Sequence, residues 1–287
     1  MIEAHRRQMS EQYRKRLGGG QMTPALSGLV LQIIVYVLVF GGLLVWVVRS
    51  KWFSWQPFGS GILVFVVFVL ILEQIVHSLM IAPPAGEGSF PHLRWSDSPL
   101  LYALYGAFMA GVFEEGGRII AFFLLIPRRH KYGDGFVYGL GHGGAELLLI
   151  GLVSAINALV LIMTVSSEGA QPILQNLPAD QLKIIEQSAR TIQETPFFMF
   201  IIGLLERFAA LFIQIALSLF VLLGIRQKRY LVFPAAILLH ALVDFMPALY
   251  QAGIIRNIWI VEGVVWIFGI LALGFVFGSR RLFQAAP

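Results

Sequence analysis

The sequence lacks cysteine entirely, so disulfide bonds, thiolate metal ligands and cysteine nucleophiles are all excluded. Charged residues are also scarce: they make up 13% of the 287 residues, whereas soluble domains carry about 25%. Hydrophobic residues account for 57% of the chain, and the mean hydropathy is +0.78. This balance is typical of an integral membrane protein. The net charge of +5 lies mostly between the apolar runs, where it reports membrane orientation rather than nucleic-acid binding.

Several apolar runs are long enough to cross a bilayer, which requires about 20 apolar residues each. We expect spans at residues 26–48, 61–82, 99–126, 135–163, 197–225, 230–250 and 258–278. The predicted fold is therefore an all-α polytopic membrane protein with about seven transmembrane helices. The first run is too long for a signal-peptide core and has no small-residue cleavage site, so we interpret it as a span.

Two polar segments lie outside these runs. Residues 1–20 are basic and have no apolar periodicity, which predicts a flexible or peripheral arm, and residues 21–287 are expected to form a single transmembrane domain. Residues 164–195 form the only long polar insert. Its centre, 179–192, alternates apolar and charged residues in a pattern that favours an amphipathic helix at the membrane interface.

The basic residues predict the orientation of the spans. With seven spans, four basic segments fall on one side: Arg49 with Lys51, 128–131, 226–229 and Arg280 with Arg281. The positive-inside rule makes that side cytoplasmic. The basic N-terminal arm then lies on the other side, against the rule.

Charged residues inside the spans are the main functional signal. Glu114, Glu115 and Arg118 interrupt the third run, and each charge costs about 2.5–3.5 kcal/mol at the centre of a membrane helix. Ionisable residues also occur in five other spans: Glu73, His77, His142, Glu146, Glu206, Arg207, His240, Asp244 and Glu262. Seven carboxylates thus accompany two arginines. Protonated acids, charged histidines or a bound cation must balance them.

Depth and spacing suggest which of these residues form one site. Counted from the expected span ends, Glu73, Glu114, His142 and His240 lie at similar depths, roughly 12–20 Å from one face. By the same count Glu206 lies nearer the opposite face, outside the core of the site. Glu262 lies near a span end and is expected to reach water.

Three pairs are spaced so that they share one helix face. Arg118 lies three residues after Glu115 and four after Glu114, so it can pair with either carboxylate. His142 with Glu146, and His240 with Asp244, are each four residues apart and can converge on a metal ion or a water molecule. The simplest interpretation of Glu115 with Arg118 is a structural ion pair. The same holds for Glu206 with Arg207, while Glu73 with His77 fits either a supporting or a packing role.

Glycines adjoin these residues. Gly139, Gly141, Gly143 and Gly144 surround His142, and Gly116 and Gly117 follow the carboxylates. In a membrane span such glycines allow close approach of helices, or leave room for a substrate.

The order of these motifs resembles a known pattern. Glu114-Glu115-x-x-Arg118, Tyr138-x-x-x-His142 and His240-x-x-x-Asp244 resemble the motifs EExxxR, FxxxH and HxxxN/D of the CAAX-prenyl-endopeptidase family and related bacterial intramembrane peptidases. The string from Gly141 to Glu146 is more similar to the YhfC family of membrane metallopeptidases. Tyr138 replaces the usual Phe, and the arginine comes one residue early.

The resemblance implies a catalytic membrane domain and roles for its residues. Glu114 would be the general base with His142 beside it, and His240 and Asp244 would stabilise an oxyanion or hold the water or metal. Arg118 would orient the carboxylates. The implied catalytic set is Glu114, Glu115, His142, His240 and Asp244, and the supporting set is Arg118, Glu146, Glu73 and Tyr138.

The resemblance further implies a cofactor and a substrate. Zinc or another divalent metal would take three protein ligands and water, with His142, His240 and one carboxylate, Glu146 or Asp244, as ligands. A metal-free mechanism needs only Glu114 and histidine. The expected partners are a membrane-embedded or membrane-associated peptide and the lipid bilayer, with no nucleic acid, in a prokaryotic plasma membrane.

Two other functions use the same residues. Buried Asp, Glu and His also form proton relays in proton- or cation-coupled transporters, although the sequence has no clear inverted repeat with matched broken helices. A noncatalytic scaffold with a metal-stabilised partner site is the third possibility.

Overall fold

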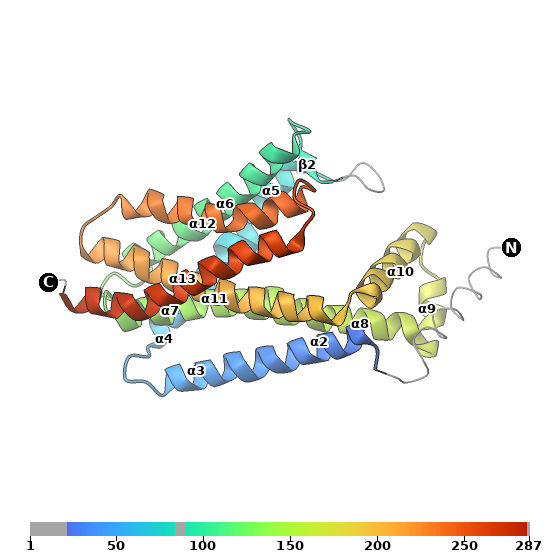
Figure 1. Ribbon diagram of the computed structural model, residues 1–287, viewed down its shortest axis with the longest axis horizontal. Coiled ribbons are helices and arrows are strands. Elements are labelled where there is room, and N and C mark those ends of the chain that lie inside the picture. The colour runs from blue at the N-terminus through green and yellow to red at the C-terminus, as the bar shows by residue number, and fades with distance from the viewer. Residues whose placement is uncertain (1–21, 84–89, 286–287) are drawn as a thin grey trace. The chain divides into compact units, whose positions relative to one another are not determined.

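The computed structural model describes residues 22–83 and 90–285, which are mostly helical (Figure 1). The expected arm at 1–20 lies outside the described residues. Six helices in the described part of the chain are long and apolar enough to cross a membrane: Pro24–Val48, Trp55–Met80, Tyr132–Ser166, Phe197–Arg226, Val232–Gln251 and Ile258–Gln284. The other expected span is α6 (Pro99–Ile120), a 22-residue helix in which Glu114, Glu115 and Arg118 interrupt the apolar stretch. The all-α polytopic fold is confirmed.

Contacts divide the chain into two compact units, which we describe separately. The smaller unit comprises residues up to 42 together with 148–204, and the larger unit comprises 43–147 and the residues from 205 onward. The single domain expected for 21–287 stays a prediction.

The smaller unit is built on helices α2 (Pro24–Val35) and α8 (Val153–Ser166). Thr23 caps α2, because its hydroxyl accepts the backbone N–H of Leu26 at 3.2 Å. The helices pack through a buried apolar cluster: Ala25, Leu29, Ala155, Ile162 and Phe200. The unit also holds the π-helical turn η2 (Tyr36–Phe40), part of η5 (Leu147–Leu152), the 3₁₀ turn η6 (Glu168–Ala170), α9 (Gln171–Gln175) and the start of α11 (Phe197–Arg226).

The polar insert contains the predicted amphipathic helix. Helix α10 (Ala179–Glu194) contacts α2 and α8 and buries Leu182 and Ala189, while Ile184 is exposed. The helix is thus confirmed, and its place at the membrane interface stays a prediction.

The larger unit contains the helices that carry the predicted site residues. They are most of α3 (Gly41–Val48), α4 (Trp55–Val64), α5 (Gln74–Met80), α6, α7 (Tyr132–Glu146), the rest of α11, α12 (Val232–Gln251) and α13 (Ile258–Ala285). The π-helical turns η3 (Phe65–Glu73) and η4 (Ala121–Leu125) follow α4 and α6. Between α5 and α6, strands β1 (Ile81–Ala82) and β2 (His92–Leu93) pair antiparallel, with Ile81 opposite Leu93.

Glycines of α7 allow its close packing against α4 and α11. A Cβ atom on Gly141 would strike the carbonyl oxygen of Phe58 in α4. A Cβ atom on Gly139 would lie 2.6 Å from the Cα atom of Ile215 in α11. The close approach expected around His142 is therefore confirmed. It also holds for Gly117, whereas Gly116 faces open space and fits the other alternative, that the glycine leaves room.

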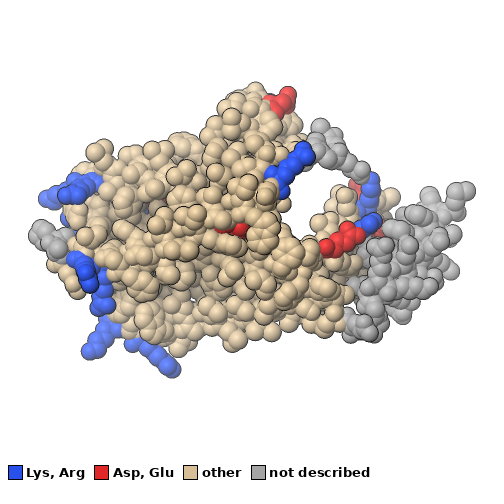
Figure 2. Space-filling view, in the orientation of Figure 1, with Lys and Arg blue, Asp and Glu red and all other residues tan. Residues whose placement is uncertain are grey.

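Basic segments gather at one end of the larger unit. Arg226, at the end of α11, donates to the carbonyl of His130 at 3.3 Å and lies 5.9 Å from the ring centre of Phe283 near the end of α13. Trp52, beside the basic loop after α3, packs 6.0 Å from Tyr132. Figure 2 shows a cluster of Lys and Arg side chains at the left end of the view, where α13 finishes. The cytoplasmic location of this end stays a prediction.

Candidate active site

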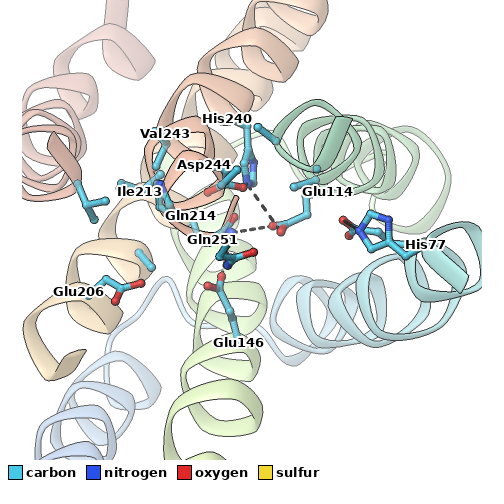
Figure 3. A pocket seen from close by; sticks show the side chains of 18 of the residues that line it. His77, Glu114, Glu146, Glu206, Ile213, Gln214, His240, Val243, Asp244 and Gln251 are labelled. Carbon is cyan, nitrogen blue, oxygen red and sulfur yellow. Dashed lines mark hydrogen bonds and ion pairs between the residues drawn. The ribbon is translucent and has the colours of Figure 1, made fainter. Parts of the chain in front are cut away.

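Five of the nine predicted site residues line one cavity in the larger unit, and the other four, Glu115, Arg118, Tyr138 and His142, lie outside its lining (Figure 3). Its volume is about 400 Å³, and η3, α5, α6, α7, α11, α12 and α13 contribute to its wall. The ionisable lining residues are Glu73, His77, Glu114, Glu146, Glu206, Arg207, His240 and Asp244. Residues from distant parts of the sequence thus meet around a space large enough for several water molecules or part of a peptide.

Glu114 is held by side chains from three other helices. His142 Nε2 lies 3.0 Å from its Oε2 atom, and Gln214 donates to the same oxygen at 2.7 Å. His240 Nε2 lies 3.7 Å from its other oxygen, Oε1. The residue is only 7% exposed but lines the cavity. Its carboxylate is therefore fixed in orientation and within reach of a water molecule in the cavity.

Glu115 lies behind this carboxylate and is fully buried. Arg118 forms an ion pair with Glu115 and also donates to the side-chain oxygen of Gln214. His240 Nδ1 lies 2.8 Å from Oε1 of Glu115. Arg118 thus pairs with Glu115 rather than Glu114, and Glu115 orients His240 so that its Nε2 atom faces Glu114.

His142 is fully buried and packed between aromatic rings. Its ring centre lies 5.4 Å from that of Phe65, edge to face, and 6.3 Å from the nearly parallel ring of Tyr138. Tyr138 in turn contacts Phe122 at 4.7 Å. Within the described residues, His142 Nδ1 and the Tyr138 hydroxyl have no hydrogen-bond partner. Tyr138 therefore supports the His142 ring by packing.

A second group of charges, Glu146, Glu206 and Arg207, lines the same cavity. Glu146 accepts from Gln214 at 2.9 Å and pairs with Arg207 at 3.4 Å, and Arg207 also pairs with Glu206. The expectation that Glu206 lies outside the site was wrong, because it lines the same cavity. Asp244 lies 3.4 Å from His240 Nε2, and its side chain is 37% exposed.

Two other acids differ in position. Glu73 pairs with His77 at 3.2 Å, and His77 Nδ1 contacts the Tyr105 hydroxyl at 3.1 Å, so this pair forms part of the cavity wall. Glu262 is only 3% exposed. The expectation that it reaches water near a span end was wrong, because the start of α13 is packed against neighbouring helices.

Gln214 is the site residue that the sequence analysis missed. It is 4% exposed and hydrogen-bonds to three charged residues, Arg118, Glu114 and Glu146. The available signal was a single amide within the apolar stretch of α11. Gln214 connects the general-base candidate to both groups of charges.

The side chains as arranged do not fit a metal ion. Among the residues that the structure describes, no group of three or more His, Asp or Glu side chains is placed to hold one. The Nε2 atoms of His142 and His240 both approach Glu114, while Gln214 and Arg207 engage Glu146. Imidazole and carboxylate donors suited to zinc are present, but they contact one another or Gln214 and Arg207, and no three of them converge on one point as a zinc site requires.

The fold and the site define a polytopic helical membrane protein with a buried carboxylate–histidine centre. Residues 33–265 match the sequence model described as YhfC intramembrane metalloprotease, and the chain belongs to this family. It is 35% identical over 263 residues to "Uncharacterized membrane protein YhfC" of Bacillus subtilis (strain 168), covering 91% of this chain and 96% of that protein. No solved structure matches the chain. The resemblance of the string from Gly141 to Glu146 to the YhfC family is thus confirmed, whereas the relation to the CAAX-prenyl-endopeptidase family stays a prediction.

Proposed function

We propose that the protein is an intramembrane peptidase that hydrolyses a peptide bond in a membrane-embedded or membrane-associated substrate. The observation that carries this proposal is the carboxylate of Glu114, which lies in the cavity wall between His142, Gln214 and His240. The description of the family as an intramembrane metalloprotease supports the same reaction class.

The proposed reaction uses Glu114 as a proton carrier. Glu114 removes a proton from a cavity water, and the resulting hydroxide attacks the peptide carbonyl carbon. The carbonyl electron pair moves to the oxygen, giving a tetrahedral intermediate. Protonated Glu114 then delivers its proton to the departing nitrogen as the carbon–nitrogen bond breaks. The products are a carboxylic acid and an amine.

His240 is placed to stabilise the intermediate. Its Nδ1 atom contacts Glu115, and Asp244 lies near Nε2, so carboxylates on two sides favour a positively charged imidazole. Nε2 can then donate to the oxyanion that forms next to Glu114, the role of a preorganised oxyanion-hole donor. We assign positioning roles to Glu115, Arg118 and Gln214, which hold His240 and Glu114 in place.

The proposal is tested by Glu114→Gln in the full chain, reconstituted in vesicles with a panel of fluorogenic membrane-inserted reporter peptides. We expect cleavage to fall at least about 100-fold, because an amide cannot accept the proton of water. The helical circular dichroism spectrum should not change. Glu194→Gln, on the exposed surface of α10, is the matched control and should cleave normally. Equal cleavage by Glu114→Gln and wild type would contradict the assignment.

Zinc is the cofactor expected from the family, and whether the protein binds it is tested separately. Its ligands would be His142, His240 and either Glu146 or Asp244, and when bound it would act as a Lewis acid. These groups would have to move from the arrangement described here. A metal-bound form would contain about one metal per chain in detergent-purified protein, lost in both His142→Ala and His240→Ala, whereas the Glu114–His240 reaction described above needs none. Metal retained in both variants would contradict this ligand set.

A second candidate function is proton- or cation-coupled transport. It is favoured by the row of carboxylates from Glu73 through Glu114 and Glu146 to Glu206 along the cavity. Ion flux in the same vesicles, with no cleavage of any reporter, would support transport over hydrolysis. For either function we propose a prokaryotic plasma membrane as the location, because the relative described above is a membrane protein of a bacterium.

A further inference from the structure

A second hollow in the larger unit lies between α11, α12 and α13, and we call it the apolar groove. Its volume is about 280 Å³, and every residue that lines it is apolar. It opens to the surface, since Leu239 and Leu271 in its lining are 41% and 63% exposed. All three helices are long and apolar enough to cross a membrane, so we expect the groove to face the hydrocarbon region.

Small residues create the depth of the groove. Ala216 of α11 and Ala272 of α13 lie in its floor, each 8% exposed. Phe220 and Phe275 bridge the same two helices, with ring centres 6.2 Å apart in an edge-to-face contact. Hollows next to small residues are where apolar side chains pack closely within a membrane, since van der Waals contact rather than the hydrophobic effect drives association there.

The apolar groove adjoins the catalytic cavity. Ile213 and Val243 line both spaces. The next residue after each, Gln214 and Asp244, belongs to the catalytic centre, and Figure 3 shows all four side by side. From Ile213 to Phe220 the groove follows α11 for roughly 10 Å. An apolar chain lying in the groove would therefore lie beside the wall of the cavity that Glu114 lines.

We propose that the apolar groove binds apolar side chains of the substrate next to the scissile bond, so that the substrate is an apolar membrane-embedded peptide segment. This inference rests on the proposed peptidase function. An extended peptide advances about 3.3 Å per residue, and alternate side chains share one face. A groove of roughly 10 Å thus receives two alternate side chains, which sets a preference for large apolar residues at two positions on one side of the cleaved bond.

The test uses the full-length Glu114→Gln protein, which is expected to bind peptide without cleaving it. The protein is reconstituted in phosphatidylcholine vesicles with a synthetic Leu/Ala peptide that carries one benzoylphenylalanine. After irradiation, we expect cross-links mapped by mass spectrometry to include Leu239 and Leu271. Adding Ala216→Trp or Ala272→Trp should fill the floor and lower the yield at least fivefold. Adding Ile270→Trp, a change at a 70% exposed residue outside the groove, should not.

The outcomes separate this inference from the proposed function. Cross-links that avoid the groove, or that persist with both groove tryptophans, overturn the inference. So does labelling of the groove by a photoreactive phospholipid that the peptide does not displace. Cross-link mapping on the Glu114→Gln protein without a groove substitution tests whether the peptide lies in the groove even where a tryptophan variant fails to fold. Glu114-dependent reporter cleavage with an unlabelled groove would overturn the inference and leave the proposed function standing. A labelled groove with no cleavage by the wild-type protein would overturn the proposed function, and the groove would then be a binding site for apolar peptides only.

Discussion

The replacement Gln214→Met tests whether a neutral side chain organises the charged centre. Methionine is similar in size but removes the acceptor for Arg118 and the donor to Glu114 and Glu146. Hydrogen bonds to charged groups contribute about 1.5–3 kcal/mol each. We expect a loss of unfolding free energy of about 3–5 kcal/mol. This is less than the sum of the three hydrogen bonds, because the fully buried Arg118 and Glu115 retain each other as partners.

This loss is measured as a fall in Tm of the detergent-purified protein. At about 2–4 °C per kcal/mol, the expected decrease is roughly 6–20 °C. Reporter cleavage should fall about 10–100-fold, the usual cost of losing a partner that orients a functional group. Gln214→Glu separates the contribution of the contact with Arg118 from that of the contacts with Glu114 and Glu146. It retains an acceptor for Arg118 but places a carboxylate against Glu114 and Glu146, so activity should fall at least as far.

Gln251→Met provides the control. Gln251 lines the same cavity, and its side chain has no hydrogen bond to another described residue. The same change there should shift Tm by no more than about 1–2 °C, the range of a substitution that breaks no special feature. Equal effects of the two substitutions on Tm and cleavage would refute the role of Gln214.

Two further predictions concern the supports of His142. Gly141→Ala should lower the unfolding free energy by about 1–3 kcal/mol, because its Cβ atom would strike the carbonyl of Phe58. Gly116→Ala is the control and should not lower the unfolding free energy, because a Cβ atom there has nothing within 4 Å. Thermal melts of the two variants test the difference. Tyr138→Phe should retain stability and cleavage because it keeps the ring, whereas Tyr138→Ala should cost about 3–5 kcal/mol. A severe defect in Tyr138→Phe would show that the hydroxyl acts in the reaction.

The apolar runs predicted the helices well, because a membrane-spanning backbone must satisfy its own hydrogen bonds and the helix is the available solution for a single segment. The ionisable residues within the spans also predicted the site. A charged side chain that faces lipid costs free energy, so such residues usually face the interior of the helix bundle or a polar cavity. Glu73, Glu114, His240 and Asp244 come from three separate helical segments and line one cavity. Their grouping was expected from depth alone.

Other features depended on information that spacing does not contain. Arg118 can reach a carboxylate three or four residues before it, and helix geometry allows both. Only the packing of His240 and Gln214 around the pair selects Glu115. Counting from a helix end placed Glu206 outside the core of the site. Because α11 has 30 residues, about 45 Å at 1.5 Å per residue, such a count does not measure depth in a bilayer core of about 30 Å.

The contacts in the structure show how the excess of carboxylates in the spans can be compensated without a metal ion. From the sequence, seven carboxylates against two arginines mildly favoured a bound cation. In the structure six of these acids lie within ion-pair distance of a histidine or arginine: Glu73, Glu114, Glu115, Glu146, Glu206 and Asp244. Protons on histidine can therefore provide much of the compensation that a metal would provide. Because a cation and protonated histidines both balance the charge, the excess of acids does not decide between a metal-bound and a Glu–His mechanism. The difference lies in His142 and His240: their loss should remove a metal in the first case, and should leave Glu114 without its partners in both.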